Sequence, residues 1–189
     1  GALILAQLCR TRERWDHLWL VAPMLGIDTA PLPWGAAHRL AGAMARLGFA
    51  TCRVPGSARG ASHAPRAFEG NPLTGDRGRY QQFAAFLRTR PELGVRGVSF
   101  GWINQAARAM EALHRALRET PLMQPMTLFL GDDERVVAPG AIEQAMPYLP
   151  QADLLFLARA RHEVMMETPE ILDRFWEAVD GRLADLSAG

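Results

Sequence analysis

Three short apolar runs, separated by turns and helical patterns, limit the possible folds more than any other feature of the chain. The runs are residues 17–24, 126–130 and 153–158. None alternates polar with apolar residues, and the first two are typical of strands buried on both faces of a parallel sheet. Helical patterns opening at Pro139 and Pro169 follow the last two runs. This strand–helix–strand–helix order predicts an α/β fold with right-handed connections.

The segment between the first two runs has a different character. Helical periodicity predicts three helices within it, over residues 34–47, 77–88 and 100–118. Residues 49–75 are rich in glycine, proline, serine and alanine, and predict a long loop. A further helical pattern opens the chain at residues 1–9. We therefore expect an α/β core formed by residues 1–25 and 121–189, with a mostly helical cap inserted at residues 26–120.

Composition places the chain among ordinary globular proteins. Of its 189 residues, 49% are hydrophobic and 22% are charged, which excludes disordered and disulfide-scaffold proteins. The longest nearly apolar stretch, residues 18–27, is far shorter than the ~20 residues of a membrane-spanning helix. Cys9 and Cys52 have no nearby partner cysteine and are interpreted as free, buried thiols in a reducing compartment. We expect a cytoplasmic protein, with peripheral contact to the inner membrane as the alternative.

Charge is distributed unevenly along the chain. All 21 basic residues are arginines; residues 1–120 hold 16 of them against 8 acidic residues, and residues 121–189 hold 5 against 12. The basic part either favours an anionic partner such as a lipid head group or is simply a solvated surface. No zinc-ligand spacing, recognition helix or aromatic RNA-binding motif accompanies the arginines, so we expect no nucleic-acid partner.

Titratable side chains follow the last two predicted strands. Asp132, Asp133 and Glu134 come directly after the second run, and His162 follows the third after a short turn. Because active sites of open α/β sheets lie at the carboxyl ends of the strands, this order suits the acid and the general base of a hydrolytic triad. A metal site would need a second cluster of ligands, which the sequence does not show. We expect neither a metal nor a cofactor.

Several sequence blocks together resemble a known enzyme family. They are Val21–Gly26, Asn71–Tyr80, Gly131–Val137, and His162-Glu163 with Glu167. In order and spacing they resemble the lysophospholipase L2 and monoacylglycerol lipase branch of the α/β-hydrolases, a group similar to serine aminopeptidase S33. The resemblance implies a triad of serine, acid and histidine below a helical cap. It assigns His162 as the base and Glu134 as the acid, with Asp133 as the alternative acid.

The same resemblance bears on the nucleophile. The family's G-x-S-x-G elbow lies just before the helix that opens this chain, which implies a nucleophilic serine upstream of Gly1 and makes the chain the C-terminal portion of an α/β-hydrolase. Residues 97–101 also spell G-x-S-x-G. The preceding residues 90–96 are polar and interrupted by glycine, however, and make a poor strand for an elbow. We therefore expect Ser99 to be a helix N-cap.

Together these observations predict a serine ester hydrolase acting on lysophospholipids or monoacylglycerols. Acyl transfer to an acceptor other than water would use the same residues. The alternatives are a non-catalytic remnant of the fold that serves as an interaction domain, and a complete hydrolase that uses Ser99. We expect a small lipid or ester substrate and peripheral membrane contact through the cap, and the oligomeric state is left open. Several large apolar residues of the cap form either its own core or an acyl-chain pocket, among them Phe49, Phe86, Trp102 and Met110.

Overall fold

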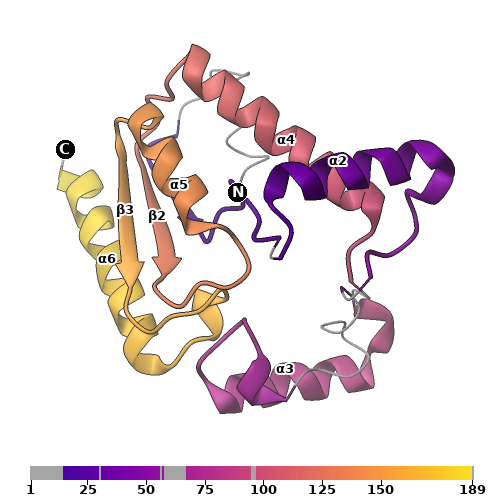
Figure 1. The fold of residues 1–189 in the computed structure, drawn as a ribbon. Helices are drawn as coiled ribbons and strands as arrows, with labels where there is room; N and C mark the ends of the chain where they lie inside the picture. Colours follow the sequence, from indigo (N-terminus) through magenta and orange to yellow (C-terminus); the bar gives the residue numbers. More distant parts are fainter. Residues whose placement is uncertain (1–14, 30, 56, 58–66, 95–96, 189) are drawn as a thin grey trace. The chain divides into compact units, whose positions relative to one another are not determined.

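A computed structural model describes residues 15–29, 31–55, 57, 67–94 and 97–188 (Figure 1). Three strands and five α-helices follow one another in these residues: β1 (Leu18–Val21), α2 (Trp34–Met44), α3 (Arg77–Thr89), α4 (Phe100–Glu119), β2 (Met126–Gly131), α5 (Pro139–Ala145), β3 (Ala152–Leu157) and α6 (Pro169–Ala188). Short 3-10 turns lie at Phe68–Gly70, Pro91–Leu93, Met146–Tyr148 and Val164–Met166. The helix expected at residues 1–9 lies outside the described residues.

The three strands form one parallel sheet in the order β1-β2-β3. In register, Leu18 pairs with Met126, and Met126 pairs in turn with Ala152. Every residue of the central strand β2 is buried. This agrees with the continuous apolar run, because a strand with neighbours on both edges and helices on both faces has no side open to water.

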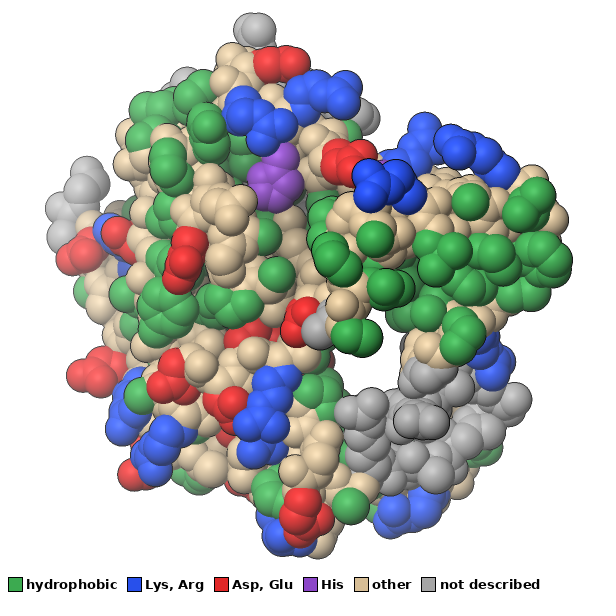
Figure 2. Space-filling view, viewed as in Figure 1, with side chains coloured by type: hydrophobic (Ala, Val, Ile, Leu, Met, Phe, Trp, Pro, Cys, Tyr) green, Lys and Arg blue, Asp and Glu red, His purple; other side chains and the backbone are tan. Residues whose placement is uncertain are grey.

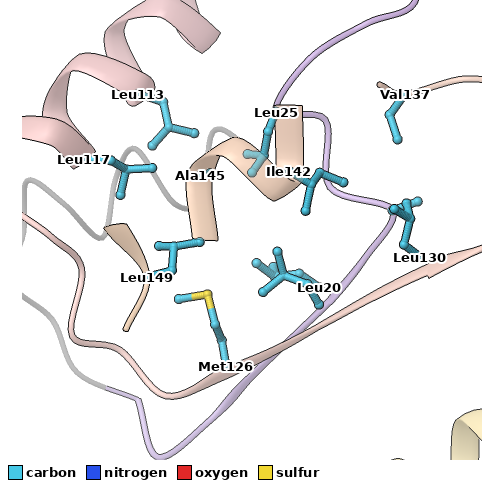
Figure 3. Close-up of a cluster of buried hydrophobic side chains, with 12 residues drawn as sticks. Leu20, Leu25, Leu113, Leu117, Met126, Leu130, Val137, Ile142, Ala145 and Leu149 are labelled. Carbon is cyan, nitrogen blue, oxygen red and sulfur yellow. The ribbon is translucent and has the colours of Figure 1, made fainter. Parts of the chain in front are cut away.

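Helices cover both faces of the sheet. Leu128 and Leu130 of β2 lie in a cluster with side chains of β1, α4 and α5, part of which is drawn in Figure 3. Phe129 points to the opposite face and packs against Phe175 of α6, with the two ring centroids 4.6 Å apart. Alternate residues of one strand thus belong to two cores, one on each face of the sheet.

The chain divides into two compact units. The first comprises the residues up to Ile27, the five residues Pro72–Asp76, and the chain from Met110 onward; the second comprises Asp28–Asn71 and Arg77–Ala109. The first unit therefore contains the whole sheet, and the second contains α2, α3 and the first half of α4. Pro72–Asp76 and the second half of α4 belong to the first unit, whereas the sequence-based division places them in the cap.

In the second unit, α2 continues as a π-helical turn over Ala45–Phe49 and bends at Gly48, whose φ of +90° suits the expected helix end. The following residues pair with the start of α4: the amide of Gly101 donates to the carbonyl of Ala50 at 2.8 Å. A side chain at Gly101 would collide with that carbonyl, since its Cβ would lie 2.8 Å from the oxygen.

The expectation that Cys52 is buried is wrong, and one of the two interpretations of the apolar cap residues is excluded for three of them. Cys52 is exposed and free, because its segment lies on the surface of the second unit; Cys9 lies outside the described residues. Of the large apolar residues of the cap, Met110 is buried, but Phe49, Phe86 and Trp102 are exposed. These three do not form a core. No helix within the described ranges is long and apolar enough to cross a membrane.

Candidate active site

Glu134 lies in the turn between β2 and α5, and its side chain is fully buried. Its Oε1 accepts hydrogen bonds from the amides of Val136 and Val137 at 2.6 and 3.1 Å. Burial alone would raise the pKa of the carboxyl group, but the hydrogen bonds from His162 and Val136 outweigh it, and the pKa lies below its usual value. Glu134 is therefore an ionised carboxylate in a fixed orientation.

His162 follows β3 and directs its Nδ1 at this carboxylate. The Nδ1 atom lies 3.0 Å from Oε2 and 3.1 Å from Oε1 of Glu134. Burial alone would lower the pKa of the imidazole, but the hydrogen bond and the charge of Glu134 outweigh it and place the pKa above the usual histidine value. The side chain is 20% exposed, and Nε2 has no hydrogen-bond partner among the described residues. The contact fixes the tautomer that leaves Nε2 free to accept a proton.

Gly131, the last residue of β2, allows the histidine turn to approach the strand. A Cβ on Gly131 would lie 2.6 Å from the carbonyl carbon of Ala160 and 2.9 Å from the carbonyl oxygen of Arg161. Just beyond it, the amide of Asp133 donates to the carbonyl of Ala160 at 3.0 Å. The turn leading to His162 thus passes directly over the end of β2. It occupies the space that the side chain of any residue other than glycine at position 131 would need.

Asp133, the alternative acid, has different partners. Arg135 donates to its two oxygens from Nε and Nη2, both at 2.8 Å, and Arg161 donates from Nε at 3.1 Å. Burial alone would raise the pKa of Asp133, but the hydrogen bonds and charges of Arg135 and Arg161 together outweigh it, and the pKa lies below its usual value. Of the two candidate acids, the structure places only Glu134 in contact with His162.

The three consecutive acidic residues do not converge on one point. Asp132 accepts the amide of Arg159 at 2.5 Å, Asp133 faces two arginines, and Glu134 faces His162. In the part of the chain that the structure describes, no group of three or more His, Cys, Asp or Glu side chains is arranged to hold a metal ion. Of the two arginines after β3, Arg159 pairs with Glu170 and Arg161 pairs with Asp133.

Ser99 is the N-cap of α4, as the sequence predicts. Its Oγ accepts the amide of Trp102 at 3.1 Å, which is the standard capping contact. Ser99 itself forms an isolated antiparallel bridge with Arg53, and no strand leads into it among the described residues. The strand–turn–helix context of a nucleophile elbow is therefore missing from the residues that the structure describes around Ser99.

The sequence places Glu167 in a motif but does not indicate that its side chain is buried. In the structure Glu167 is fully buried beside the histidine turn, and its carboxylate accepts the amides of Gly75 and Arg161. The only signal in the sequence is an acidic residue next to apolar neighbours, which does not by itself distinguish a buried carboxylate from an exposed one.

Comparison with known protein families identifies the family of the chain. The sequence pattern described as serine aminopeptidase, S33 matches residues 1–169. The chain belongs to the serine aminopeptidase S33 family. The matched region of this S33-family chain includes both Glu134 and His162. A search of curated proteins finds no significant match.

Solved structures show that the S33-family chain has part of the α/β-hydrolase fold. It is similar to a monoglyceride lipase from Saccharomyces cerevisiae, with a TM-score of 0.67, 15% identity, and coverage of 98% of this chain and 62% of that one. It is also similar to a monoacylglycerol lipase from Paleococcus ferrophilus, with a TM-score of 0.63, 18% identity, and coverage of 98% of this chain and 65% of that one. A carboxyl esterase from Bacillus coagulans has a TM-score of 0.65 and 12% identity, with coverage of 98% of this chain and 62% of that one. The chain thus spans less than two thirds of the length of these proteins.

Proposed function

We propose that this chain supplies the acid and the general base of a serine ester hydrolase whose nucleophilic serine lies upstream of residue 1. The observation that carries the proposal is the contact between Glu134 and His162, which follow neighbouring parallel strands. One imidazole nitrogen is held by a buried carboxylate while the other is left free, as the proton-transfer step of ester hydrolysis requires. Family membership and the fold support the same reaction class.

In this mechanism Nε2 of His162 takes the proton of the serine hydroxyl as its oxygen attacks the ester carbonyl. The alcohol then leaves with that proton, and an acyl-enzyme remains. Water attacks the acyl-enzyme, passing one proton to Nε2, and the serine recovers this proton when the carboxylic acid is released. Glu134 stays ionised throughout and stabilises the imidazolium. These steps require no metal or cofactor.

We propose a lipid ester as the substrate class, with lysophospholipids and monoacylglycerols as candidates, and peripheral membrane contact through α2. On this helix Arg39 and Leu40 are exposed, and on the π-helical turn that continues it, Ala45–Phe49, so are Arg46 and Leu47; the exposed fractions of the two leucines are 49% and 70%. In each pair an exposed arginine is directly followed by an exposed leucine, so basic and apolar side chains lie next to each other on the surface. Figure 2 shows blue and green side chains side by side over this part of the chain. Such a helix suits an anionic lipid surface.

The charge of the surrounding sequence supports this partner. Between Asp28 and Glu69 the chain has five arginines and no acidic residue. Each basic side chain near an anionic membrane contributes about 1 kcal/mol of binding free energy. Free Cys52 is compatible with a reducing compartment, and we propose the cytoplasmic side of the inner membrane as the location.

Removing the charges of Arg39 and Arg46 is expected to weaken membrane binding. The double variant Arg39→Gln/Arg46→Gln of the full-length protein should bind vesicles of anionic lipid about tenfold or more weakly, in a co-sedimentation assay at low salt. The matched control is Arg115→Gln/Arg118→Gln, which removes two exposed arginines from α4 and should leave binding unchanged. Equal binding of the two double variants would refute contact through α2.

The catalytic proposal is tested by labelling with a fluorophosphonate probe, read by peptide mass spectrometry. In the full-length protein we expect a labelled serine outside these 189 residues, with labelling abolished by His162→Ala and retained in Ser99→Ala. Because an unfolded variant would also lose labelling, circular dichroism spectra must show that both variants are folded. Labelling at Ser99 would indicate the complete-hydrolase alternative, and a folded protein that is not labelled would indicate a non-catalytic remnant.

A further inference from the structure

Glu167 joins two segments that are far apart in the sequence. Its carboxylate accepts the amide of Gly75 at 3.0 Å on Oε1 and 2.9 Å on Oε2, and Oε1 also accepts the amide of Arg161 at 2.7 Å. The side chain is fully buried. A buried carboxylate is retained only where hydrogen bonds replace its hydration, and here backbone amides of both segments do so.

Further hydrogen bonds tie the same two segments together on each side of His162. The amide of Glu163 donates to the carbonyl of Leu73 at 2.8 Å, and the guanidinium of Arg161 donates to the carbonyl of Thr74 at 2.9 Å. The hydroxyl of Thr74 donates to the carbonyl of Met166 at 2.6 Å. The neighbours of His162 on both sides are thus held by Pro72–Asp76, so that a shift of this segment shifts the imidazole.

Gly75 gives the carboxylate the room to make this contact. A Cβ at Gly75 would lie 3.2 Å from Oε2 of Glu167, closer than side chains normally approach. An alanine there would push the carboxylate by a few tenths of an ångström without removing its charge. Two substitutions therefore disturb the contact in different ways. Gly75→Ala displaces the carboxylate of Glu167, whereas Glu167→Gln replaces the carboxylate by an amide.

We propose that Glu167 is a positioning residue for His162, which it holds in place by clamping Pro72–Asp76 to the turn after β3. The proposal rests on the proposed hydrolase function and extends it to a residue that does not touch the substrate. In Glu167→Gln the amide NH₂ takes the place of one carboxylate oxygen and faces the N–H of Gly75, so two donors oppose each other and the clamp loosens. A misplacement of a catalytic group by about 1 Å can lower a rate about 100-fold, so we expect displacement of the His162 imidazole to lower kcat.

The test compares Glu167→Gln and Gly75→Ala with Glu170→Gln in the full-length protein. Glu170→Gln is the matched control, because it removes an exposed carboxylate from the same stretch of chain. We expect ester hydrolysis with kcat lowered about 10- to 100-fold in Glu167→Gln and less in Gly75→Ala, KM nearly unchanged, and wild-type kinetics in Glu170→Gln.

A second measurement does not depend on activity. The Nδ1 proton of His162, held by Glu134, is followed by NMR in the same variants, and we expect its resonance to shift or broaden in Glu167→Gln and Gly75→Ala. If the wild-type protein proves inactive, the proposed function fails while this resonance still tests the clamp. An unchanged resonance and kcat in both variants would overturn the proposal. If Glu167→Gln does not fold, Gly75→Ala decides by the same two readouts.

Discussion

A Gly131→Ala variant is expected to lose about 3 kcal/mol or more of unfolding free energy, the upper range for an overpacked interior. The loss comes from a steric clash and not from backbone conformation, since the new Cβ would meet the carbonyl groups of Ala160 and Arg161. These atoms belong to the backbone of the histidine turn and cannot rotate away as a side chain would. Relief would require the turn to lift off the end of β2, which also withdraws His162 from Glu134.

The measurement is chemical denaturation of the full-length protein, with Gly181→Ala as the matched control. Gly181 lies within α6, and a Cβ there would meet no atom within 4 Å. The same chemical change is therefore expected to stabilise the protein by about 0.5–1 kcal/mol, because alanine favours a helix over glycine. If Gly131→Ala unfolds at the same denaturant concentration as the wild type, the described approach of the turn to β2 is incorrect.

If the proposed function holds, Glu134→Gln is expected to lower kcat for ester hydrolysis about 10³- to 10⁴-fold, as loss of the triad acid does in serine hydrolases. Val136 and Val137 donate to Oε1, so the carbonyl oxygen of the new amide will occupy that position and its NH₂ will face Nδ1 of His162. The imidazole must then accept at Nδ1 and carry its proton on Nε2. In that tautomer it cannot accept the proton of the serine.

Asp133→Asn is the matched comparison, because it alters the adjacent carboxylate, which pairs with arginines. We expect its kcat to stay within about tenfold of the wild type, since no group in contact with His162 changes. NMR titration gives an independent check. The pKa of His162 should fall from above the usual histidine value to below it in Glu134→Gln, because burial remains while the carboxylate charge is lost. A larger loss of kcat in Asp133→Asn than in Glu134→Gln would make Asp133 the acid.

Local sequence patterns predicted most of the described fold. The strand expected at residues 126–130 is β2, extended by Gly131, and the helix expected from Pro139 is α5. A strand buried on both faces requires an apolar run, and proline at a helix start contributes no amide that would need a partner, so both signals are local. The capping role of Ser99 was equally readable, since its partner is only three residues away.

Contacts between distant residues could not be predicted in the same way. The sequence placed an acid near His162 but left two consecutive candidates, because the choice depends on which carboxylate turns inward after β2. Glu167 and Gly75 are 92 residues apart, and nothing in either neighbourhood indicates the other. The catalytic role of Glu134 and His162 stays a prediction until the variants are measured.

The path of the chain through Pro72–Asp76 has a practical consequence for exchanging caps between relatives. The chain passes between the two units after Ile27, Asn71, Asp76 and Ala109. A chimera that replaces residues 28–109 as one cassette would discard the five residues that accept and donate the hydrogen bonds around His162. A graft in two pieces, residues 28–71 and 77–109, would leave the native Pro72–Asp76 with its own turn. The turn that holds His162 would then keep its native hydrogen bonds.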